Sequence, residues 1–343
     1  MNFDIENFAA LRSYLKRQGH IRLKESLSLE KLEGGVSNRT VHIRWPDGRA
    51  WVLKQALPKL RVEADWFSNP GRIRVEARAL QWLNHALPQG STPAFILADS
   101  ANNLFAMEAV PEPHENWKRL LLAGHVVPDH FAQSAALLAA IHRRSTETAA
   151  QMRETFAETT HFESLRLQPY YIYSARQVPE AAPFLCALAT DTLQHKICLV
   201  HGDFSPKNIL IRNGKLVLLD HEVMHFGEPA FDLGFVFAHF LSKAHHVHEK
   251  RAEIAAGAVL FWHVYQDQIA PLPWSTALET RAVRHTLACL LARVAGKSPL
   301  EYLSTTEKDR QRNVVLPLMA KHPATMAALI TQFTHDVEAH AKN

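Results

Sequence analysis

One β-rich segment constrains the fold more than any other stretch of this chain. It reads ICLVHGDFSPKNILIRNGKLVLLDHE, from residue 197 to residue 222. Asn213-Gly214 lies between two apolar runs and is a strong signal for a two-residue hairpin, because both positions of a type I′ turn need positive φ. Counting outward from this turn pairs Asn208 with Leu219. The sequence therefore predicts that Asn208 and Asp220 lie side by side at the open end of the hairpin.

Two further polar residues precede this hairpin. His201 and Asp203 follow directly after the apolar run ICLV, so we expect them to lie near the open end of the hairpin. An amide oxygen from Asn208 and carboxylates from Asp203 and Asp220 then converge on one point. A small set of oxygen ligands suits Mg²⁺, which keeps several waters and shares its shell with substrate phosphates. The pattern indicates phosphate chemistry.

The N-terminal part of the chain, at residues 27–108, is typical of a small antiparallel sheet. Its β-type runs are LSLEKL, TVHIRW, AWVLK, AFILA and LFAME, and its turn signals are Gly34-Gly35, Pro46-Asp47-Gly48 and Asn102-Asn103. One helix is predicted after Asn69-Pro70-Gly71. The residues that share its inward face are Ile73, Glu76, Leu80 and Leu83. A carboxylate on such a face is unusual.

The character of the sequence changes after Pro111 and Pro113. Long Ala/Leu-rich stretches such as FAQSAALLAAIHRR and TRAVRHTLACLLARVAG predict helices up to the C-terminus, interrupted by the β-rich segment. We therefore expect an N-terminal helical extension at 1–26, an N-terminal lobe at 27–110 and a mainly helical C-terminal lobe at 111–343.

The spacing of the polar residues around the hairpin resembles that of a known superfamily. Asp203, four residues and then Asn208 reproduce the D-x-x-x-x-N of the protein-kinase catalytic loop, and Asp220 takes the place of its DFG aspartate. His-Gly-Asp and Asp220-His221-Glu222 look like the aminoglycoside phosphotransferase, choline kinase and methylthioribose kinase superfamily. This resemblance implies an α/β (α+β), two-lobed protein-kinase-like fold that binds ATP and Mg²⁺.

The resemblance also implies a role for each matching residue. Asp203 would accept or orient the proton of the substrate hydroxyl. The implied metal ligands are Asn208, Asp220 and Glu222, of which Glu222 would contact a second magnesium directly or through water. His201 would be structural. Asp232, in the segment GEPAFDLGFVF, would brace the catalytic loop and take no part in the chemistry.

The N-terminal lobe supplies the nucleotide-binding residues that the resemblance demands. Lys54 ends the strand AWVLK and resembles the lysine that contacts the α and β phosphates, while Glu76 resembles the helix glutamate that holds it. Backbone N–H groups of the Gly-rich turn could cover phosphates, although Gly-Gly between strands is usually only a turn. The other implied nucleotide-binding residues are Gly34, Gly35, Ser37 and Asn38 in that turn, and Met107, Glu108 and Val110 where adenine would bind.

The region around Lys54 is most similar to methylthioribose kinases. The matching blocks are Lys54-Gln55-Ala56-Leu57-Pro58 and Arg74-Val75-Glu76-Ala77. Asn208, however, stands where those kinases tend to have serine, and this chain is shorter than a typical member. A methylthioribose-like sugar is the first expectation for the acceptor. Arg293, in ARVAGKSPLEYL, and Arg284 are candidate substrate residues, and charges on a helix surface explain both equally well.

The charge of the chain helps to rank the alternative functions. The net charge of +4 comes from 38 basic and 34 acidic residues without a block of one sign, which disfavours nucleic-acid binding. The C-terminal lobe has no acidic run for a polycationic aminoglycoside, so an aminoglycoside or amino-alcohol (choline/homoserine-type) kinase ranks second. A catalytically weak nucleotide-binding regulatory module is the alternative from another class.

Other features point to a reducing compartment. The three cysteines form no CxxC pair, and no window contains the roughly 18 apolar residues that a membrane span needs. We expect a cytoplasmic protein whose partner is a small-molecule alcohol, and its oligomeric state is left open.

The histidine cluster His245, His246 and His248 is typical of a solvated helix face.

Overall fold

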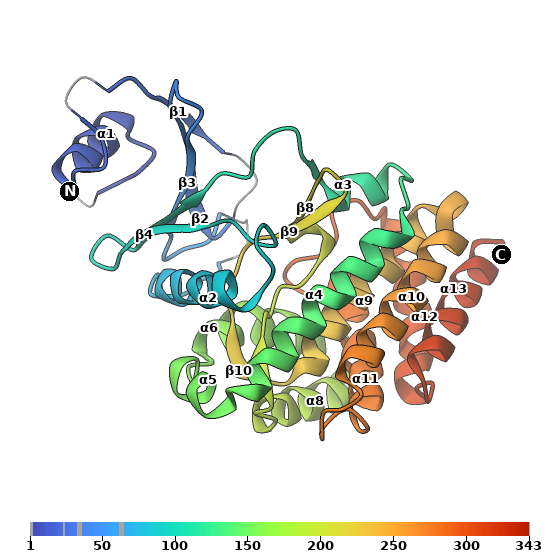
Figure 1. Cartoon of the computed structure of the whole chain (residues 1–343). Helices are drawn as coiled ribbons and strands as arrows, with labels where there is room; N and C mark the ends of the chain where they lie inside the picture. The colour runs from blue at the N-terminus through green and yellow to red at the C-terminus, as the bar shows by residue number, and fades with distance from the viewer. Residues whose placement is uncertain (1–2, 23–24, 33–35, 62–64, 343) are drawn as a thin grey trace. The chain divides into compact units, whose positions relative to one another are not determined.

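The protein is described here by a computed structural model, drawn in Figure 1. The described residues are 3–22, 25–32, 36–61 and 65–342. The chain divides into two compact units, Met1–Pro113 and His114–Asn343. Within the described residues, no helix has the length and apolar character needed to cross a membrane.

The first unit is built on one antiparallel sheet. Its strands are β1 (Ser28–Lys31), β2 (Asn38–Arg44), β3 (Ala50–Ala56), β4 (Phe95–Asp99) and β5 (Leu104–Glu108). They are arranged in the order β1-β2-β3-β5-β4, and every pair is antiparallel. This confirms the sheet that the alternating runs predict.

Two helices cover opposite faces of this sheet. Side chains alternate along a strand, so β5 sends Leu104 and Ala106 to one core cluster and Phe105 and Met107 to the other. The first cluster includes side chains of α1 (Phe8–Arg17), and the second includes those of α2 (Arg72–Ala86). The helix α1 is thus an integral part of the core of this unit.

The second unit is mainly helical. Its longer helices are α3 (Trp117–Leu122), α4 (Pro128–Glu147), α5 (Ala149–Thr155), the π-helix η1 (Glu163–Ile172), α7 (Tyr173–Gln177), α8 (Ala182–Gln194), α9 (Pro229–His246), α10 (Arg251–Ile269), α11 (Leu278–Ala295), α12 (Thr305–Ala320) and α13 (Met326–Lys342). Its short helices are α6 (Thr160–Phe162), η2 (Pro179–Ala181), η3 (Pro206–Asn208) and η4 (His248–Lys250). Its strands are β6 (Glu115–Asn116), β7 (Cys198–Val200), β8 (Ile209–Arg212), β9 (Lys215–Leu218) and β10 (His225–Gly227).

The helix α9 is the centre of this unit. All of its residues from Pro229 to His245 are buried, as expected for a helix that is apolar on every side. Gly234 allows α11 to approach closely, because a Cβ atom at this position would lie 2.4 Å from the Cβ of His285. The start of α9 lies next to the loop between β7 and η3, which carries His201 and Asp203.

Candidate active site

The hairpin β8–β9 has the register that the sequence predicts. Arg212 pairs with Lys215 across the turn, and the backbone N–H of Leu219 donates to the carbonyl oxygen of Asn208 at 2.8 Å. Asp220 follows directly and has a φ of 66°, in the left-handed region that few non-glycine residues adopt. Such backbone conformations concentrate at functional sites.

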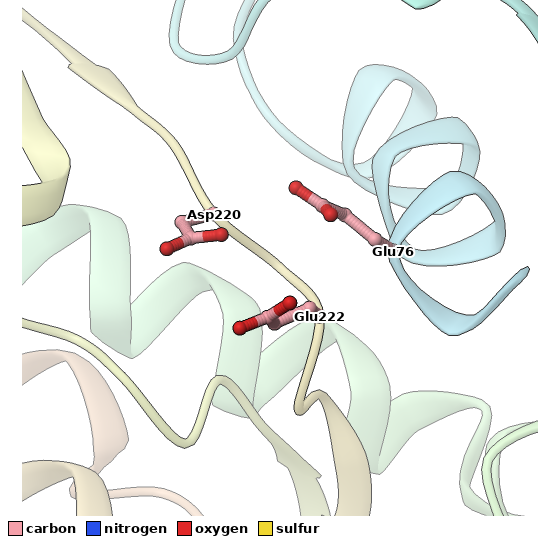
Figure 2. A group of neighbouring side chains, drawn as sticks. All are labelled: Glu76, Asp220 and Glu222. Carbon is pink, nitrogen blue, oxygen red and sulfur yellow. The ribbon is translucent and has the colours of Figure 1, made fainter. Parts of the chain in front are cut away.

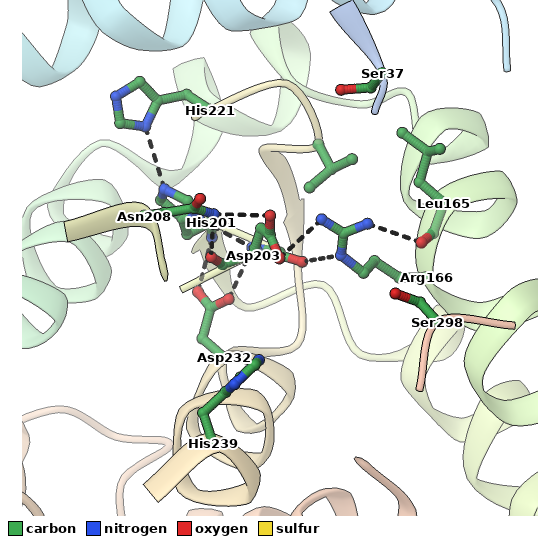
Figure 3. Close-up of polar contacts among 12 residues, drawn as sticks. Ser37, Leu165, Arg166, His201, Asp203, Asn208, His221, Asp232, His239 and Ser298 are labelled. Carbon is green, nitrogen blue, oxygen red and sulfur yellow. Dashed lines mark hydrogen bonds and ion pairs between the residues drawn. The ribbon is translucent and has the colours of Figure 1, made fainter. Parts of the chain in front are cut away.

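The Asp203 carboxylate is held on both sides (Figure 3). One oxygen accepts a hydrogen bond from Nδ2 of Asn208 at 2.7 Å, and the other lies 2.9 Å from Nη2 of Arg166. The backbone N–H of Asp203 donates to Nδ1 of His201 at 3.2 Å. The Asp203–Asn208 pair expected from the motif is therefore in direct contact, although it is the amide nitrogen of Asn208 that faces Asp203.

Arg166 is a site residue that the sequence reasoning missed. It lies in the π-helix η1 and is 7% exposed. Its Nε donates to the carbonyl oxygen of Gly202 at 2.7 Å, so it contacts both the backbone and the carboxylate of the loop. Burial alone would lower the pKa of Arg166, but Asp203 and other acidic groups, including Glu222 and Asp220, raise it above the usual value. The sequence signal is a single charged residue in the run LRLQPYYI, which is otherwise uncharged.

Asp232 fixes the loop backbone from the first turn of α9. Its two carboxylate oxygens each accept a backbone N–H at 2.7 Å, one from His201 and one from Gly202. Nε2 of His142 lies 3.1 Å from the same carboxylate. Burial would raise the pKa of Asp232, yet these hydrogen bonds and the nearby histidines lower it. The loop therefore rests on a buried, ionised carboxylate.

Gly202 has a φ of 76°, and a Cβ atom there would lie 2.8 Å from Cγ2 of Val223. Only glycine fits this backbone and this space. Nε2 of the adjacent His201 lies 3.2 Å from Nδ1 of His221. Burial lowers the pKa of His201, so its imidazole is neutral and supports the loop.

Two carboxylates lie close together after β9. A carboxylate oxygen of Asp220 lies within 4.8 Å of a carboxylate oxygen of Glu222. Figure 2 shows both residues on the segment that leaves the hairpin. The amide nitrogen of Asn208 is used by Asp203, which leaves its oxygen as the end suited to a cation. A donor set made only of oxygens fits Mg²⁺.

The first unit contains a buried ion pair. Lys54 is on β3, on the same face of the strand as Val52 and Ala56, which pack on the α2 side of the sheet. Its Nζ lies 2.6 Å from Oε1 of Glu76, and the Glu76 side chain is 1% exposed. Figure 2 shows Glu76 on α2. The inward placement of Glu76 predicted from the periodicity is confirmed.

The other predicted nucleotide-binding residues lie in or next to the strands β2 and β5 of this sheet. Gly34 and Gly35 lie outside the described residues. Ser37 and Asn38 are buried at the start of β2, where Nδ2 of Asn38 donates to Oγ of Ser37 at 3.3 Å. On β5, Met107 is buried and packs on the α2 side. The backbone N–H of Glu108 donates to the carbonyl oxygen of Ala94 at 2.8 Å, whereas no hydrogen bond of the Val110 N–H occurs among the described residues.

The two candidate substrate arginines on α11 differ in surroundings. Nη1 of Arg284 lies 3.5 Å from a carboxylate oxygen of Asp191 on α8, and its guanidinium lies over the ring of Phe184. Neither Asp191 nor Phe184 is a predicted site residue. Arg293 is 7% exposed, so its reading as a surface charge is wrong. The guanidinium carbons of Arg293 and Arg166 both lie within 6 Å of the same two ring centroids, those of Tyr170 and Phe235.

The histidine cluster is only partly solvated. His248 is exposed, but His245 is 2% exposed and its Nε2 lies 3.1 Å from the carbonyl oxygen of Glu307. The prediction of a solvated face is therefore wrong for His245, because the end of α9 packs against α12. The three histidines line a cavity of about 810 Å³.

Comparisons with known proteins agree with this architecture. A family model described as "Phosphotransferase enzyme family" matches residues 28–272. The chain is similar to methylthioribose kinase of Yersinia enterocolitica, with 27% identity over 241 residues that cover 63% of this chain and 60% of that protein. It is similar to methylthioribose kinase of Pectobacterium atrosepticum, with 26% identity over 257 residues that cover 66% and 63%. The matched stretch thus spans less than two thirds of these relatives.

Solved structures show the same fold. Macrolide 2'-phosphotransferase MphH from Brachybacterium faecium aligns with a TM-score of 0.51 and 17% identity, over 96% of this chain and 97% of that one. The gentamicin complex of APH(2")-IIa aligns with a TM-score of 0.50 and 14% identity, over 95% and 99%. The predicted fold class, a small antiparallel sheet and a mainly helical remainder, is confirmed, but the sheet packs against α1 as well as the one helix predicted for this lobe.

Proposed function

Because the chain belongs to the phosphotransferase enzyme family, we propose that it transfers the γ-phosphoryl group of ATP to a hydroxyl of a small molecule. The first unit would bind the nucleotide, and the second would carry out catalysis and bind the acceptor. The observation that carries the proposal is the Asp203 carboxylate, oriented by Asn208 and Arg166 on a loop that Asp232 fixes.

Asp203 would receive the acceptor hydroxyl. Its carboxylate would orient the oxygen toward the phosphorus and accept the proton as the new oxygen–phosphorus bond forms and the bond to the leaving nucleotide breaks. Phosphoryl transfer passes through a loose transition state, so positioning and charge stabilisation account for most of the catalysis. A carboxylate held in one orientation by two neighbours is suited to this task.

Each unit contains residues suited to binding phosphates. Asn208, Asp220 and Glu222 offer oxygen ligands for Mg²⁺, which supplies charge neutralisation on the phosphates when bound. Lys54, kept in place by Glu76, would contact the α and β phosphates. The backbone N–H of Val110 makes no hydrogen bond to any described residue, so it is a suitable donor for adenine.

The acceptor is a small alcohol, with a methylthioribose-like sugar as the first candidate on the similarity of the lysine region and of the curated relatives. Arg293 would face it, because it neighbours the residue that holds Asp203. An aminoglycoside or an amino alcohol is the second candidate within the class. A regulatory module that binds MgATP without phosphorylating an acceptor is the candidate from another class.

Replacing the proposed base tests the assignment. Asp203→Asn should lower turnover by at least about 100-fold, the usual contribution of a positioned acid–base group. The affinity for MgATP should stay within about twofold, because Asp203 is not placed at the nucleotide. ADP release with a panel of sugars and amino alcohols measures turnover, and calorimetry measures affinity.

Two outcomes would contradict the proposal. Near-wild-type turnover in Asp203→Asn would remove the assignment of the base. MgATP binding by the wild-type protein without turnover of any acceptor would favour the regulatory module.

A further inference from the structure

The second unit holds two buried positive charges, one on the proposed acceptor residue Arg293 and one on Lys243, to which no role has been given. Arg293 on α11 is 7% exposed, and Lys243 on α9 is 0% exposed. Among the described residues, neither has a carboxylate within ion-pair distance. Removing a charge from water costs several kcal/mol unless a partner compensates for it, so such residues need an explanation.

The partners of Arg293 are all neutral. Its Nη1 donates to the carbonyl oxygen of Ser298 at 2.8 Å, and its Nη2 lies 2.8 Å from Nε2 of His239. Its Nε is buried and has no hydrogen-bond partner. The guanidinium lies over the rings of Tyr170 and Phe235, 4.9 and 5.2 Å from their centroids. Because an arginine keeps its proton in proteins, this site holds a permanent charge without a counter-ion.

Two more cations extend this group toward solvent. Lys118 on α3 lies over the ring of Tyr302 at 5.8 Å and forms an ion pair with the exposed Glu301, and its own side chain is 20% exposed. Lys207 is exposed. Burial, followed by Arg293, Lys243, Lys118 and Lys207, lowers the pKa of His239 well below its usual value. We call these four cations, Arg293, Lys243, Lys118 and Lys207, the cationic cluster.

The cationic cluster adjoins the catalytic loop within the second unit. Lys207 directly precedes Asn208, and its carbonyl oxygen accepts a hydrogen bond from Nδ2 of Asn116 at 2.7 Å. On the other side, Arg293 shares two aromatic rings with Arg166, the residue that holds Asp203. Figure 3 shows Ser298 and His239, the two hydrogen-bond partners of Arg293, in the same view as Asp203 and Arg166.

We propose that the acceptor carries an oxyanion, a carboxylate or a phosphate, and that Arg293, Lys118 and Lys207 bind this group while the acceptor hydroxyl reaches Asp203. The inference names the acceptor class of the same site and so rests on the proposed function. An oxyanion would give Arg293 the counter-ion that the described residues do not supply, through charge-assisted hydrogen bonds. A polycationic acceptor would be repelled by the same residues. Within the proposed class of small alcohols, an acidic alcohol thus replaces the neutral methylthioribose-like sugar as the first candidate.

Matched probes that differ only in the acidic group test this inference. Calorimetry with MgADP present would compare D-glycerate with glycerol for the carboxylate, and ribose 5-phosphate with ribose for the phosphate. At least one acid should bind about tenfold more tightly than its neutral partner, which is the size expected for a charge-assisted hydrogen bond. The preference should fall as salt is raised, because part of the cluster is exposed.

Two variants of the short helix α3 give a matched comparison. Lys118→Met removes a partly exposed cation of the cluster and should reduce the preference for the acid about tenfold. Arg119→Met removes the neighbouring exposed charge and should leave it within about twofold. Arg293→Lys serves as a second variant, with thermal unfolding to verify that it folds, and should weaken acid binding more than neutral binding.

The two proposals fail in different ways. If no acid binds more tightly than its neutral partner, or if the preference survives Lys118→Met and Arg293→Lys, the inference is wrong even when neutral alcohols are phosphorylated. If an acid binds with the expected preference but no acceptor is turned over, the inference stands and the phosphotransferase activity does not.

Discussion

At Asp203, both carboxylate oxygens already have a neighbour that donates a hydrogen bond or carries a positive charge. Nδ2 of Asn208 lies at 2.7 Å from one oxygen, and Nη2 of Arg166 lies at 2.9 Å from the other. An acceptor hydroxyl must therefore use a remaining lone pair, since each carboxylate oxygen can accept more than one hydrogen bond. This arrangement favours orientation of the hydroxyl over strong basicity.

Arg166 should act as a positioning residue for Asp203. We expect Arg166→Met to lower kcat by about 10–100-fold while the KM for ATP stays within about twofold, because misplacing a reacting group by about 1 Å has effects of this size. Arg166→Lys should recover part of the loss, since an ammonium can still face the carboxylate. Steady-state kinetics with the acceptor identified for the wild-type protein measures both constants.

A purely structural role for Arg166 would give another pattern. The melting temperature would then fall in both variants, and kcat and the KM for ATP would change together. Equal loss in Arg166→Lys and Arg166→Met with unchanged stability would also contradict positioning by charge.

The residues of the site differ in how far the sequence could predict them. Local spacing and one turn signal predict the positions of Asp203, Asn208 and Asp220. A two-residue hairpin fixes which residues of its two strands pair with each other. Arg166 reaches the loop through tertiary packing, 36 residues before the Gly202 carbonyl oxygen that it contacts. No spacing rule connects the two positions, so the sequence could not have placed Arg166 there.

Among the elements, those with strong local signals were predicted and those that depend on packing were not. The sequence predicts the helix α2 because its apolar residues recur at spacings of three and four residues. It predicts the strands because apolar and polar residues alternate between turn signals. The π-helix η1 has no such signature, and it contains Pro169. The burial of α1 against the sheet could not be read from its own sequence, because it depends on the face that the strands leave apolar.

The contact between α9 and α11 depends on the absence of a side chain at Gly234. A Cβ atom there would lie 2.4 Å from Cβ and 2.5 Å from the backbone carbon of His285, so the helices would have to separate. We expect Gly234→Ala to lower the free energy of unfolding by about 1–3 kcal/mol or more, the cost of overpacking a core. Urea unfolding of both proteins measures the difference.

Gly257→Ala on α10 is the control for this prediction. Its added Cβ would meet the ring of Phe131 at 2.7 Å, and a side chain can move more easily than a backbone. We expect a smaller loss there. A larger loss for Gly257→Ala than for Gly234→Ala would show that the α9–α11 contact does not limit stability.

At the scale of the molecule, the second unit buries histidines in many of its elements. Burial is the main cause that lowers the pKa of His225 in β10 to about 4, of His245 in α9 to about 4 and of His285 in α11 to about 3. These imidazoles are therefore neutral in the folded protein near neutral pH. In the unfolded chain the pKa of each histidine returns to its ordinary value of 6.5.

This difference should make the folded protein sensitive to mild acid. Below pH 6.5 the unfolded chain binds more protons than the folded one, so stability falls as the pH decreases toward about 4. Each such group gives a slope of at most about 1.4 kcal/mol per pH unit near pH 5, and His201 and His239, whose pKa is also lowered, add to it. Urea unfolding at pH 7, 6 and 5 measures it. His245→Gln should reduce the slope by at most about 1.4 kcal/mol per pH unit, whereas His322→Gln, at an exposed position, should not reduce it. A free energy of unfolding that is unchanged between pH 7 and pH 5 would mean that these histidines are protonated without loss of the fold.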